Sequence, residues 1–415
     1  MRRATLLLGL SCLAGMAFAQ QVHVRDMPQV DMPAEVDSNS PAFWSGGEFH
    51  LYNSTGAGPK TSTGSDQFHL GQAQSIVMNY AQAWPTWMES VWMDEDGVVY
   101  GWYHREHFGV CPGTSLEEPQ IGAAISYDGG HSFLDMGAIL QSGDPIDCSS
   151  KNGYAVGGHG DFSVIVDRQK NYFYFLFSNY GGPLESQGVA IARMEFASRT
   201  SPVGNVWKYY QGGWTEPGIR GHMTPIFPAT VSWQRADTDS FWGPSIHWNT
   251  YLGKYVMLLN RSCCSPGYPQ EGIYVSYSKS LSNPGSWTQP VKFLDNTGWY
   301  PQVIGSGANG TDKLAGRVAR LYIYGHSSWQ VIFERDAPVP DTPADGTQPP
   351  AATSPDDPAP PTDTPAPDPS ADDSTPPPDE GAASTDAPPA SEMVPVTESR
   401  PAIRVPRRPL HSLPQ

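Results

Sequence analysis

A two-strand unit recurs five times between residues 37 and 330 of the chain. Each copy reads as a short apolar strand, a turn with Gly or Asn, and an aromatic-rich strand that ends in polar residues. The copies begin at Asp37, Trp87, Gly160, Trp242 and Tyr300. A repeat of this kind predicts a modular architecture, because one such unit cannot bury its apolar face alone.

Most copies are followed by a third strand and by a fourth strand with Trp or Phe, as in IGAAISYDGGHSFLDMGAIL after the second copy. Helical periodicity is nearly absent, and turns rich in Gly, Pro, Asn and Asp separate the short apolar runs. The pattern predicts an all-β fold, a five-bladed β-propeller of four-stranded blades. A β-sandwich is the alternative, but it does not predict five similar hairpins.

The stretch SYDGGHSF, residues 126–133, matches the Asp-box pattern S-x-D-x-G-x-[ST]-[WF]. This pattern resembles the turn that links the third and fourth strands of a blade in sialidase-like propellers. Asp128 and the glycines suit a tight turn. We therefore interpret Asp128 as a structural residue and not as a catalytic one.

The N-terminus, MRRATLLLGLSCLAGMAFAQ, has two arginines, an apolar stretch and a small-residue cleavage site. This arrangement predicts a signal peptide over residues 1–19 and a mature chain that begins at Gln20, secreted or periplasmic. No later run is apolar enough to cross a membrane, so we expect no membrane-spanning segment. The propeller domain is predicted over residues 20–335.

Residues 336–415 contain no Phe, Trp or Tyr, and they hold 22 of the 41 prolines. Such a Pro/Asp/Thr-rich segment cannot bury enough apolar surface to offset the entropy of ordering it, so we predict a disordered tail. The tail is acidic and accounts for most of the net charge of -17. An acidic balance argues against nucleic acid as a partner. The basic tip of the tail, residues 400–415 with four arginines, is a candidate contact with an anionic cell envelope.

In a propeller, the inner strand of each blade starts at one face of the central channel, and the second strand returns to that face. We call this face the channel mouth. The predicted inner strands begin near three carboxylates, Asp37, Glu89 and Asp161. Further candidates at the ends of second strands and beside inner strands are His104, Arg105, Glu106, His159, Trp242, His247, Arg261, Trp299, Tyr300 and His326.

The placement of Asp37, Glu89 and Asp161 resembles the five-bladed propeller glycoside hydrolases, which include arabinanases, xylosidases and invertase-like enzymes. The segment DSNSPAFW from Asp37 is similar to the blade-one segment of that family. The resemblance implies a glycosidase that cleaves a poly- or oligosaccharide with paired carboxylates, without a cofactor. It implies that Asp37 is the base or nucleophile. A structural calcium ion is compatible with such propellers, but no residue pattern calls for one.

This chain departs from the family order of Asp, Asp and Glu, because blade two offers Glu89 and blade three offers Asp161. The catalytic acid therefore stays open among Asp161, Glu89 and Glu106. Structural roles are the alternatives: Asp37 could cap a turn, Asp161 could hold the Gly-rich loop before it, and Glu89 could pair with Arg105. The histidines show no tight ligand spacing, so we expect no catalytic metal.

Two other functions fit the same fold. A sialidase-like exo-glycosidase would need Arg105, Arg220 and Arg261 around one carboxylate of its substrate, with Tyr300 nearby. A carbohydrate-binding propeller without activity would use the same mouth, because a fold alone does not establish a reaction. In both cases the partner is a carbohydrate.

Four cysteines remain after signal removal, Cys111, Cys148, Cys263 and Cys264. An even number in an oxidising compartment predicts disulfides. Cys111 and Cys148 fall in loops at the channel mouth and can bridge, which leaves Cys263 and Cys264 for each other. Crossed pairing is the alternative. We expect the vicinal disulfide to wall or floor the substrate site.

Overall fold

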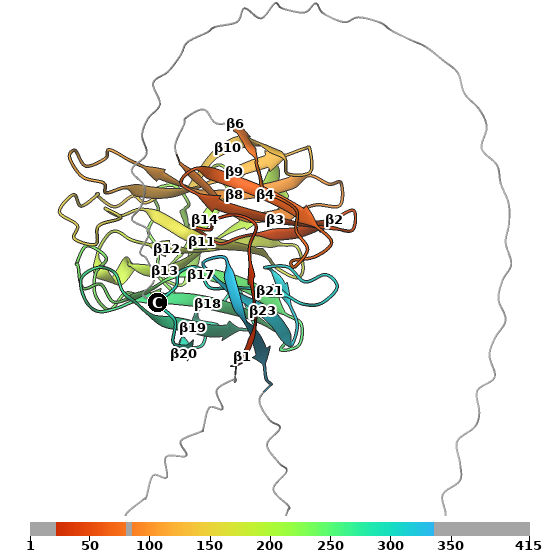
Figure 1. The fold of residues 1–415 in the computed structure, drawn as a ribbon. Coiled ribbons are helices and arrows are strands. Elements are labelled where there is room, and N and C mark those ends of the chain that lie inside the picture. Colours follow the sequence, from red (N-terminus) through yellow and green to blue (C-terminus); the bar gives the residue numbers. More distant parts are fainter. Residues whose placement is uncertain (1–21, 80–84, 336–415) are drawn as a thin grey trace, which may run out of the picture. The chain divides into compact units, whose positions relative to one another are not determined.

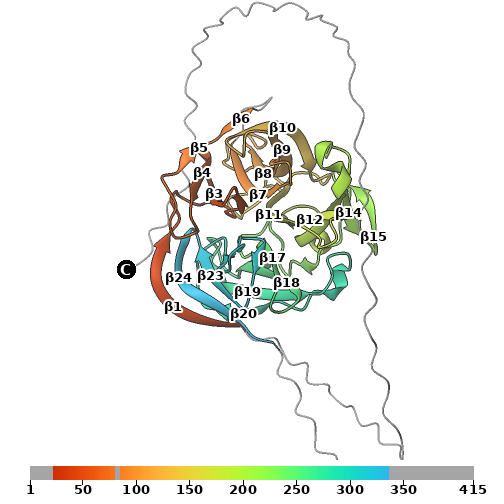
Figure 2. The ribbon, with the colours of Figure 1, turned by 90° about the vertical axis from the view of Figure 1, so that its right-hand side faces the viewer.

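The computed structural model describes residues 22–79 and 85–335. The predicted signal peptide and the predicted tail lie outside the described residues, so their boundaries stay predictions. Within the described residues the strands form five sheets, coloured in chain order in Figure 1 and arranged around a central axis in Figure 2. The five-bladed propeller is therefore confirmed, and the sandwich alternative is wrong.

The first three blades follow the chain from the inner strand outward. Blade one contains β2 (Ala42–Ser45), β3 (Glu48–Thr55), β4 (Gly58–Gly64) and β5 (Gln74–Ser75). Blade two contains β7 (Thr86–Met93), β8 (Val99–His107), β9 (Glu118–Ser126) and β10 (Ser132–Leu140), with β6 (Val77–Asn79) parallel to β10. Blade three contains β11 (His159–Val166), β12 (Tyr172–Asn179), β13 (Gly188–Glu195), β14 (Val206–Tyr210) and β15 (Gly213–Pro217), with β16 (Phe227–Pro228) beside β13.

The last two blades complete the ring. Blade four contains β17 (Ser240–Asn249), β18 (Lys254–Ser262), β19 (Gln270–Ser278) and β20 (Val291–Leu294), with β22 (Leu314–Ala315) along β17. Blade five contains β21 (Gln302–Gly305), β23 (Val318–Ile323), β24 (His326–Phe333) and β1 (Val22–Asp31). The helices of the described residues are short 3₁₀ turns at Leu184–Ser186, Phe196–Thr200 and Pro284–Ser286. Among these residues, none forms a helix of the length and apolarity needed to cross a membrane.

The ring is closed by strands from the two ends of the domain. β1 pairs antiparallel with β24, with Val22 opposite Phe333 and Asp31 opposite His326, and Figure 2 shows the two strands side by side. The outer strand of blade five thus comes from the N-terminal end of the domain, which explains why the fifth sequence unit lacks its own fourth strand.

Neighbouring blades bury both faces of each sheet. Side chains alternate along β12, so Phe173, Phe175 and Phe177 pack towards blade two, whereas Tyr174 and Leu176 pack towards blade four. A strand that is buried on both faces has apolar residues at successive positions. This is why the segment YFYFLF of β12 does not alternate between apolar and polar residues. This packing fixes the spacing of the inner strands around the channel.

Asp128 lies in the turn between β9 and β10. Its Oδ1 accepts hydrogen bonds from Ser126 Oγ at 2.7 Å and Ser132 N at 2.9 Å, and its Oδ2 accepts one from Ser132 Oγ at 2.6 Å. Although burial alone would raise the pKa of Asp128, the hydrogen bonds from Ser132 and Ser126 lower it to about 2. The carboxylate is engaged in holding the turn.

Arg320 on β23 reinforces the closure of the ring. Its side chain is buried, with Nε donating to Ser327 Oγ at 2.7 Å and Nη2 donating to Ser327 O at 2.8 Å. Nη2 also donates to Pro28 O on β1. One guanidinium therefore connects three strands of blade five.

We predict that Arg320→Leu lowers the free energy of unfolding by about 2–4 kcal/mol, because it leaves the buried Ser327 carbonyl oxygen without this donor. Urea denaturation measures the change. Arg317→Leu is the matched control, since Arg317 is exposed and paired with Glu334, and it should change stability much less than Arg320→Leu does. Equal effects of the two substitutions would contradict the role of Arg320.

Candidate functional site

Three inner strands carry a register irregularity near the channel mouth, and on two of them, β7 and β11, it falls at a carboxylate. On β7, Met88 pairs with Tyr103 and Ser90 pairs with Trp102, so Glu89 is the extra residue. On β11 the same interruption falls at Asp161, whose φ is 39°. A bulge leaves its extra residue outside the ladder and re-aims its side chain. Both carboxylates therefore leave the regular strand at corresponding positions of blades two and three.

Glu89 connects the two blades. Its side chain is fully buried, Oε1 lies 3.1 Å from His104 Nδ1, and Oε2 accepts a hydrogen bond from Phe162 N at 2.8 Å. Ligand-type atoms of Glu89, His104 and Asp161 lie within 4.8 Å of one another. We call these three residues the carboxylate–imidazole cluster. They are of the types that hold metal ions, but the two hydrogen bonds of Glu89 already engage both of its oxygens.

Glu89 and His104 retain protons more strongly than isolated side chains do. Burial raises the pKa of Glu89 to about 7, and the charge of Asp161 acts in the same direction, against the hydrogen bond from His104. Burial alone would lower the pKa of His104, but the hydrogen bond and charge of Glu89, together with Glu106 and Asp161, raise it to about 9. At neutral pH, His104 therefore carries a proton beside Glu89.

Asp161 is half-buried, and the hydroxyl of Tyr180 donates a hydrogen bond to its Oδ2. Burial and the charge of Asp161 hold the pKa of Tyr180 well above its usual value. Tyr180 thus keeps its proton and fixes the orientation of the carboxylate.

Asp37 is half-buried in the segment before β2. Its amide donates to Ser54 O at 2.8 Å, and Ser54 Oγ accepts from Met88 N at 2.9 Å, next to Glu89. Two residues further on, Asn39 Nδ2 donates to Phe162 O at 2.8 Å. These contacts bring the segment from Asp37 to the same mouth as the carboxylate–imidazole cluster.

Gly160 leaves the space that His104 occupies. A Cβ atom added at Gly160 would lie 2.8 Å from His104 Nε2 and 3.0 Å from Pro119 Cβ. The glycine therefore allows the imidazole to pack against β11, between Glu89 and Asp161. Because no positive φ is required at Gly160, the constraint at this position is space.

An aromatic cluster borders Asp161 on the side of blades three to five. Its members are Tyr154, Tyr180, Trp233, Trp242, Tyr268, Trp299 and Tyr300. The ring of Trp242 meets those of Trp299 and Tyr300 edge-on, with centroids 5.3 Å and 5.7 Å apart, and its Nε1 donates to Gln270 Oε1 at 2.8 Å. Tyr154 and Trp299 are half-buried, so they offer ring surface at the mouth. Aromatic rings of this kind suit the apolar faces of sugars.

Two predicted binding histidines lie in the core. His159 is fully buried with its ring 4.9 Å from Phe177, and burial and the charge of Lys208 hold its pKa well below the usual value. His247 on blade four packs against Phe333 of blade five, and burial lowers the pKa of His247 to about 3. The prediction that these side chains contact substrate is wrong, because both are neutral and covered by neighbouring blades.

Other predicted residues have partners in the fold. Arg261 makes a bidentate ion pair with Asp239 at 2.8 and 3.0 Å, and the exposed His326 binds Asp31 on β1 at 2.7 Å. Neither of these two contacts indicates a role in substrate binding.

Arg105 and Glu106 occupy opposite faces of β8. Arg105 is buried with its guanidinium 5.9 Å from the ring centroid of Tyr103, and the side-chain partner of Glu89 is His104 instead of Arg105. Glu106 is also buried, with Oε1 3.9 Å from His104 Nε2. Glu106 thus acts on the cluster through its charge.

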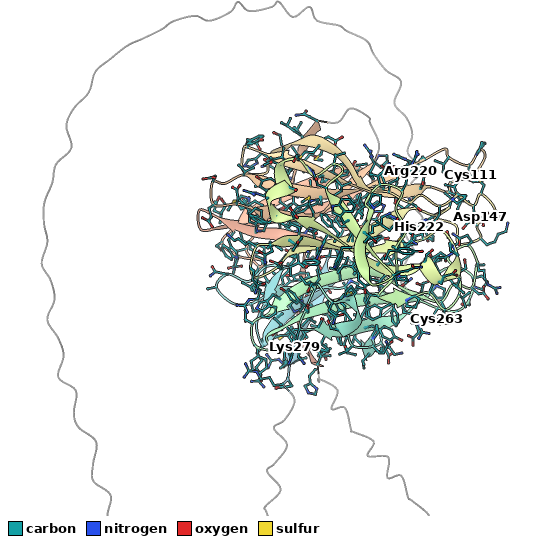
Figure 3. The ribbon with its side chains drawn as sticks, turned by 180° about the vertical axis from the view of Figure 1, so that it is seen from behind. Cys111, Asp147, Arg220, His222, Cys263 and Lys279 are labelled. Carbon is teal, nitrogen blue, oxygen red and sulfur yellow. A yellow bond between two sulfur atoms is a disulfide. The ribbon has the colours of Figure 1, made fainter. Side chains whose placement is uncertain are left out.

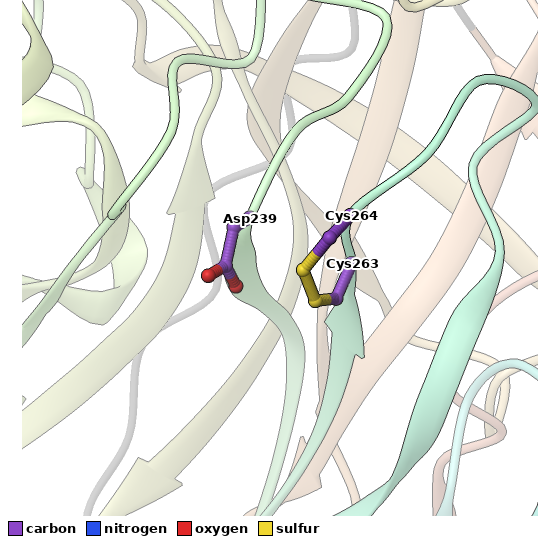
Figure 4. A group of neighbouring side chains, drawn as sticks. All are labelled: Asp239, Cys263 and Cys264. Carbon is purple, nitrogen blue, oxygen red and sulfur yellow. A yellow bond between two sulfur atoms is a disulfide. The ribbon is translucent and has the colours of Figure 1, made fainter.

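The structure contains both disulfides, Cys111–Cys148 and Cys263–Cys264. Figure 3 shows Cys111 and Cys263 on the same side of the propeller. The amide of Cys263 donates to Pro269 O at 3.1 Å, which closes the loop that carries Tyr268 into the aromatic cluster. Cys264 is exposed, and Figure 4 shows the pair next to Asp239. The vicinal disulfide thus lies at the base of a mouth loop.

Sequence reasoning missed Tyr154, Trp233 and Tyr268 as members of the aromatic cluster. All three come from loops at the channel mouth, where the strand repeat does not indicate the direction of a side chain. Tyr268 follows the cysteine pair closely, and this proximity was the one indication in the sequence.

Neither a protein-family model nor a curated relative matches the chain. An endo-arabinase from Bacteroides thetaiotaomicron is similar in structure, with 12% identity, a TM-score of 0.47, and coverage of 75% of this chain and 98% of that one. An exo-β-1,3-galactanase from Clostridium thermocellum has 13% identity, a TM-score of 0.41, and coverage of 74% and 62%. This chain therefore spans less than two thirds of the galactanase. The five-bladed assignment rests on the strand pairing of this chain itself.

The carboxylate–imidazole cluster predicts a specific dependence of stability on pH. Raised pKa values mean that the folded state binds more protons than the unfolded state, so stability falls as pH rises. The contribution of His104 is fully present below pH 6.5 and is lost as pH rises through about 9, and that of Glu89 is lost between pH 4.5 and about 7.

We expect the melting temperature of wild type, relative to a Glu89→Gln/His104→Gln variant, to fall steadily from about pH 5 to about pH 10. Thermal unfolding monitored by circular dichroism measures this difference. An Asp66→Asn/His69→Gln variant removes an exposed Asp–His contact and serves as the control. A difference that stays constant or grows with pH would contradict the protonation of the cluster.

A methyl group at position 160 should displace His104. We predict that Gly160→Ala destabilises the fold by about 1–3 kcal/mol through overpacking and returns the pKa of His104 towards its usual value, as measured by histidine NMR titration. Gly307→Ala is the control, because a Cβ atom there meets no atom within 4 Å. An unchanged His104 titration in Gly160→Ala would show that the glycine does not position the imidazole.

Proposed function

We propose that the chain is a glycoside hydrolase that cleaves a poly- or oligosaccharide at the channel mouth. The observation that supports the proposal is that ligand-type atoms of Glu89 and Asp161 lie within 4.8 Å of each other, beside an aromatic cluster and near the segment that carries the half-buried Asp37. Hydrolysis of a glycosidic bond needs one carboxyl group as acid and a second as base or nucleophile. Asp37 and Asp161 are the two that retain exposed surface.

The three carboxylates take different roles. Asp161 is proposed as the acid, oriented by the hydrogen bond from Tyr180, and Asp37 as the base or nucleophile. Glu89 is a positioning residue, because it is fully buried and its two oxygens bind His104 and Phe162 N. It holds the ionisable pair of Glu89 and His104 next to Asp161, so the charge of this pair interacts with the proposed catalytic acid.

The arrangement of cations favours a neutral glycan over a sialic acid. Arg105 packs against Tyr103, Arg261 is committed to Asp239, and Arg220 lies in the connection after β15. A sialidase-type cluster of three arginines on one substrate carboxylate would require all three to leave these positions.

The other parts of the proposal rest on sequence. The signal-peptide pattern supports action outside the cytoplasm, and the basic tip of the tail is proposed to contact the cell envelope. The acidic composition argues against a nucleic-acid partner. The chemistry proposed needs only carboxyl groups and water, without a cofactor.

A carbohydrate-binding propeller without activity is the second candidate. The observation that favours it is the engagement of both Glu89 oxygens within the protein, together with a short Asp at the blade-three position. In that case the mouth would bind a glycan without cleaving it.

We expect Asp37→Asn and Asp161→Asn each to lower the rate of reducing-sugar release by about 10²–10⁴-fold or more, since each removes a proton-transferring or nucleophilic group. The full chain is assayed on plant, algal and bacterial-envelope polysaccharides. Asp26→Asn, on the exposed face of β1, is the control and should retain full activity.

Binding to the same polysaccharides, measured in parallel, separates the two candidates. Glycan binding with no release by wild type would replace the hydrolase with the binding propeller. Release that persists in both variants would show that other groups carry the reaction.

A further inference from the structure

A cavity lies on the mouth side of the propeller, outside the carboxylate–imidazole cluster. It has a volume of 390 Å³, and three connections line it: the crossing from blade two to blade three with Asp144 and Asp147, the β12–β13 connection with Leu184, and the loop before β17 with Ser232 and Gln234. We call it the side pocket. Its volume falls within the range of small-molecule sites, and Figure 3 marks Asp147 on its wall.

Tyr180 connects the side pocket to the cluster. Its hydroxyl binds Asp161, and its carbonyl oxygen accepts a hydrogen bond from Gln234 Nε2 at 2.7 Å. Gly182, two residues further along the chain, lines the pocket. Tyr180 therefore belongs to both surroundings: its hydroxyl binds Asp161, and its main chain leads into the connection that lines the pocket.

The wall of the side pocket is held rigidly by buried amides. Gln187 is 1% exposed, and its Nε2 donates to Gly182 O at 2.7 Å and to Gln234 Oε1 at 2.9 Å. Its Oε1 accepts from Trp233 N at 2.7 Å. The Cys111–Cys148 disulfide fixes the crossing next to Asp147. A pocket built in this way binds without first having to order its loops.

The lining defines the class of ligand. The carboxylates of Asp144 and Asp147 suit the hydroxyl groups of a sugar, while Leu184 offers apolar surface. The side chains of Gln234 and Ser232 bind each other and hold the wall. Of the described residues that line the pocket, none is basic. Two carboxylates without a lining cation would repel an acidic sugar and accept a neutral or amino sugar.

We infer that the side pocket is a second sugar-binding subsite, which takes a neutral or amino-sugar unit of the same glycan that reaches Asp161 and rejects uronic acids. The inference rests on the proposed function, since it assigns a further unit of the substrate to that site. It makes the chain selective for the length and the charge of its substrate.

The test uses Leu184→Trp, which fills the pocket from an exposed position, and Ile146→Trp as the matched control. Leu184 and Ile146 are 42% and 39% exposed on connections at the channel mouth, and only Leu184 lines the pocket. Titration calorimetry on the full chain uses gluco-, xylo-, arabino-, galacto- and chito-oligosaccharides of increasing length as probes, with oligogalacturonides as acidic probes. Hydrolysis of each probe is followed separately.

We expect wild type to bind more tightly when a neutral or amino-sugar oligosaccharide is lengthened by the one unit that reaches the side pocket. Leu184→Trp should remove that gain, by about tenfold or more, whereas Ile146→Trp should keep it and oligogalacturonides should not bind. Equal affinities of wild type and Leu184→Trp, preference for the acidic probes, or binding of no probe would each overturn the subsite. Binding with this pattern but without hydrolysis would refute the proposed reaction and keep the subsite.

Discussion

The closure of the ring by β1 and β24 is the constraint on which the rest of the structure depends. Each blade packs between two others, so an open ring would expose the faces of its terminal blades and leave strand edges unpaired. Closure also fixes where the inner strands begin, because each start is set by the blades on both sides. The approach of the segment from Asp37 to Glu89 and Asp161 follows from this closed geometry and not from their separation in sequence.

Glu89 shows how the fold and the proposed chemistry share the same contacts. The carboxylate accepts the amide of Phe162, the residue after Asp161, so the bulge that presents Asp161 is held from the neighbouring blade. A buried carboxylate needs partners in a low-dielectric site, and His104 supplies a charged one. The energy that stabilises the interface between blades two and three therefore also sets the electrostatic surroundings of Asp161.

The sequence was sufficient for the architecture, because five hairpins of similar pattern leave few alternatives. It also placed Glu89 and Asp161 at the mouth, since the start of an inner strand is readable from the repeat. The sequence could not show that the side chains of His159 and His247 point into the core, because side-chain direction near a bulge does not follow simple alternation. Tyr268 and the side pocket depend on loops that have no periodic pattern. The pairing of β1 with β24 joins segments at opposite ends of the domain, which local periodicity does not report.

The register of β1 on β24 also determines where the chain leaves the propeller. Val22 lies opposite Phe333, and Arg335 donates hydrogen bonds to Tyr251 O in the hairpin between β17 and β18, on the face opposite the channel mouth. The two ends of the described domain therefore lie together on the face opposite the mouth, and neither end takes part in the loops that surround Asp161.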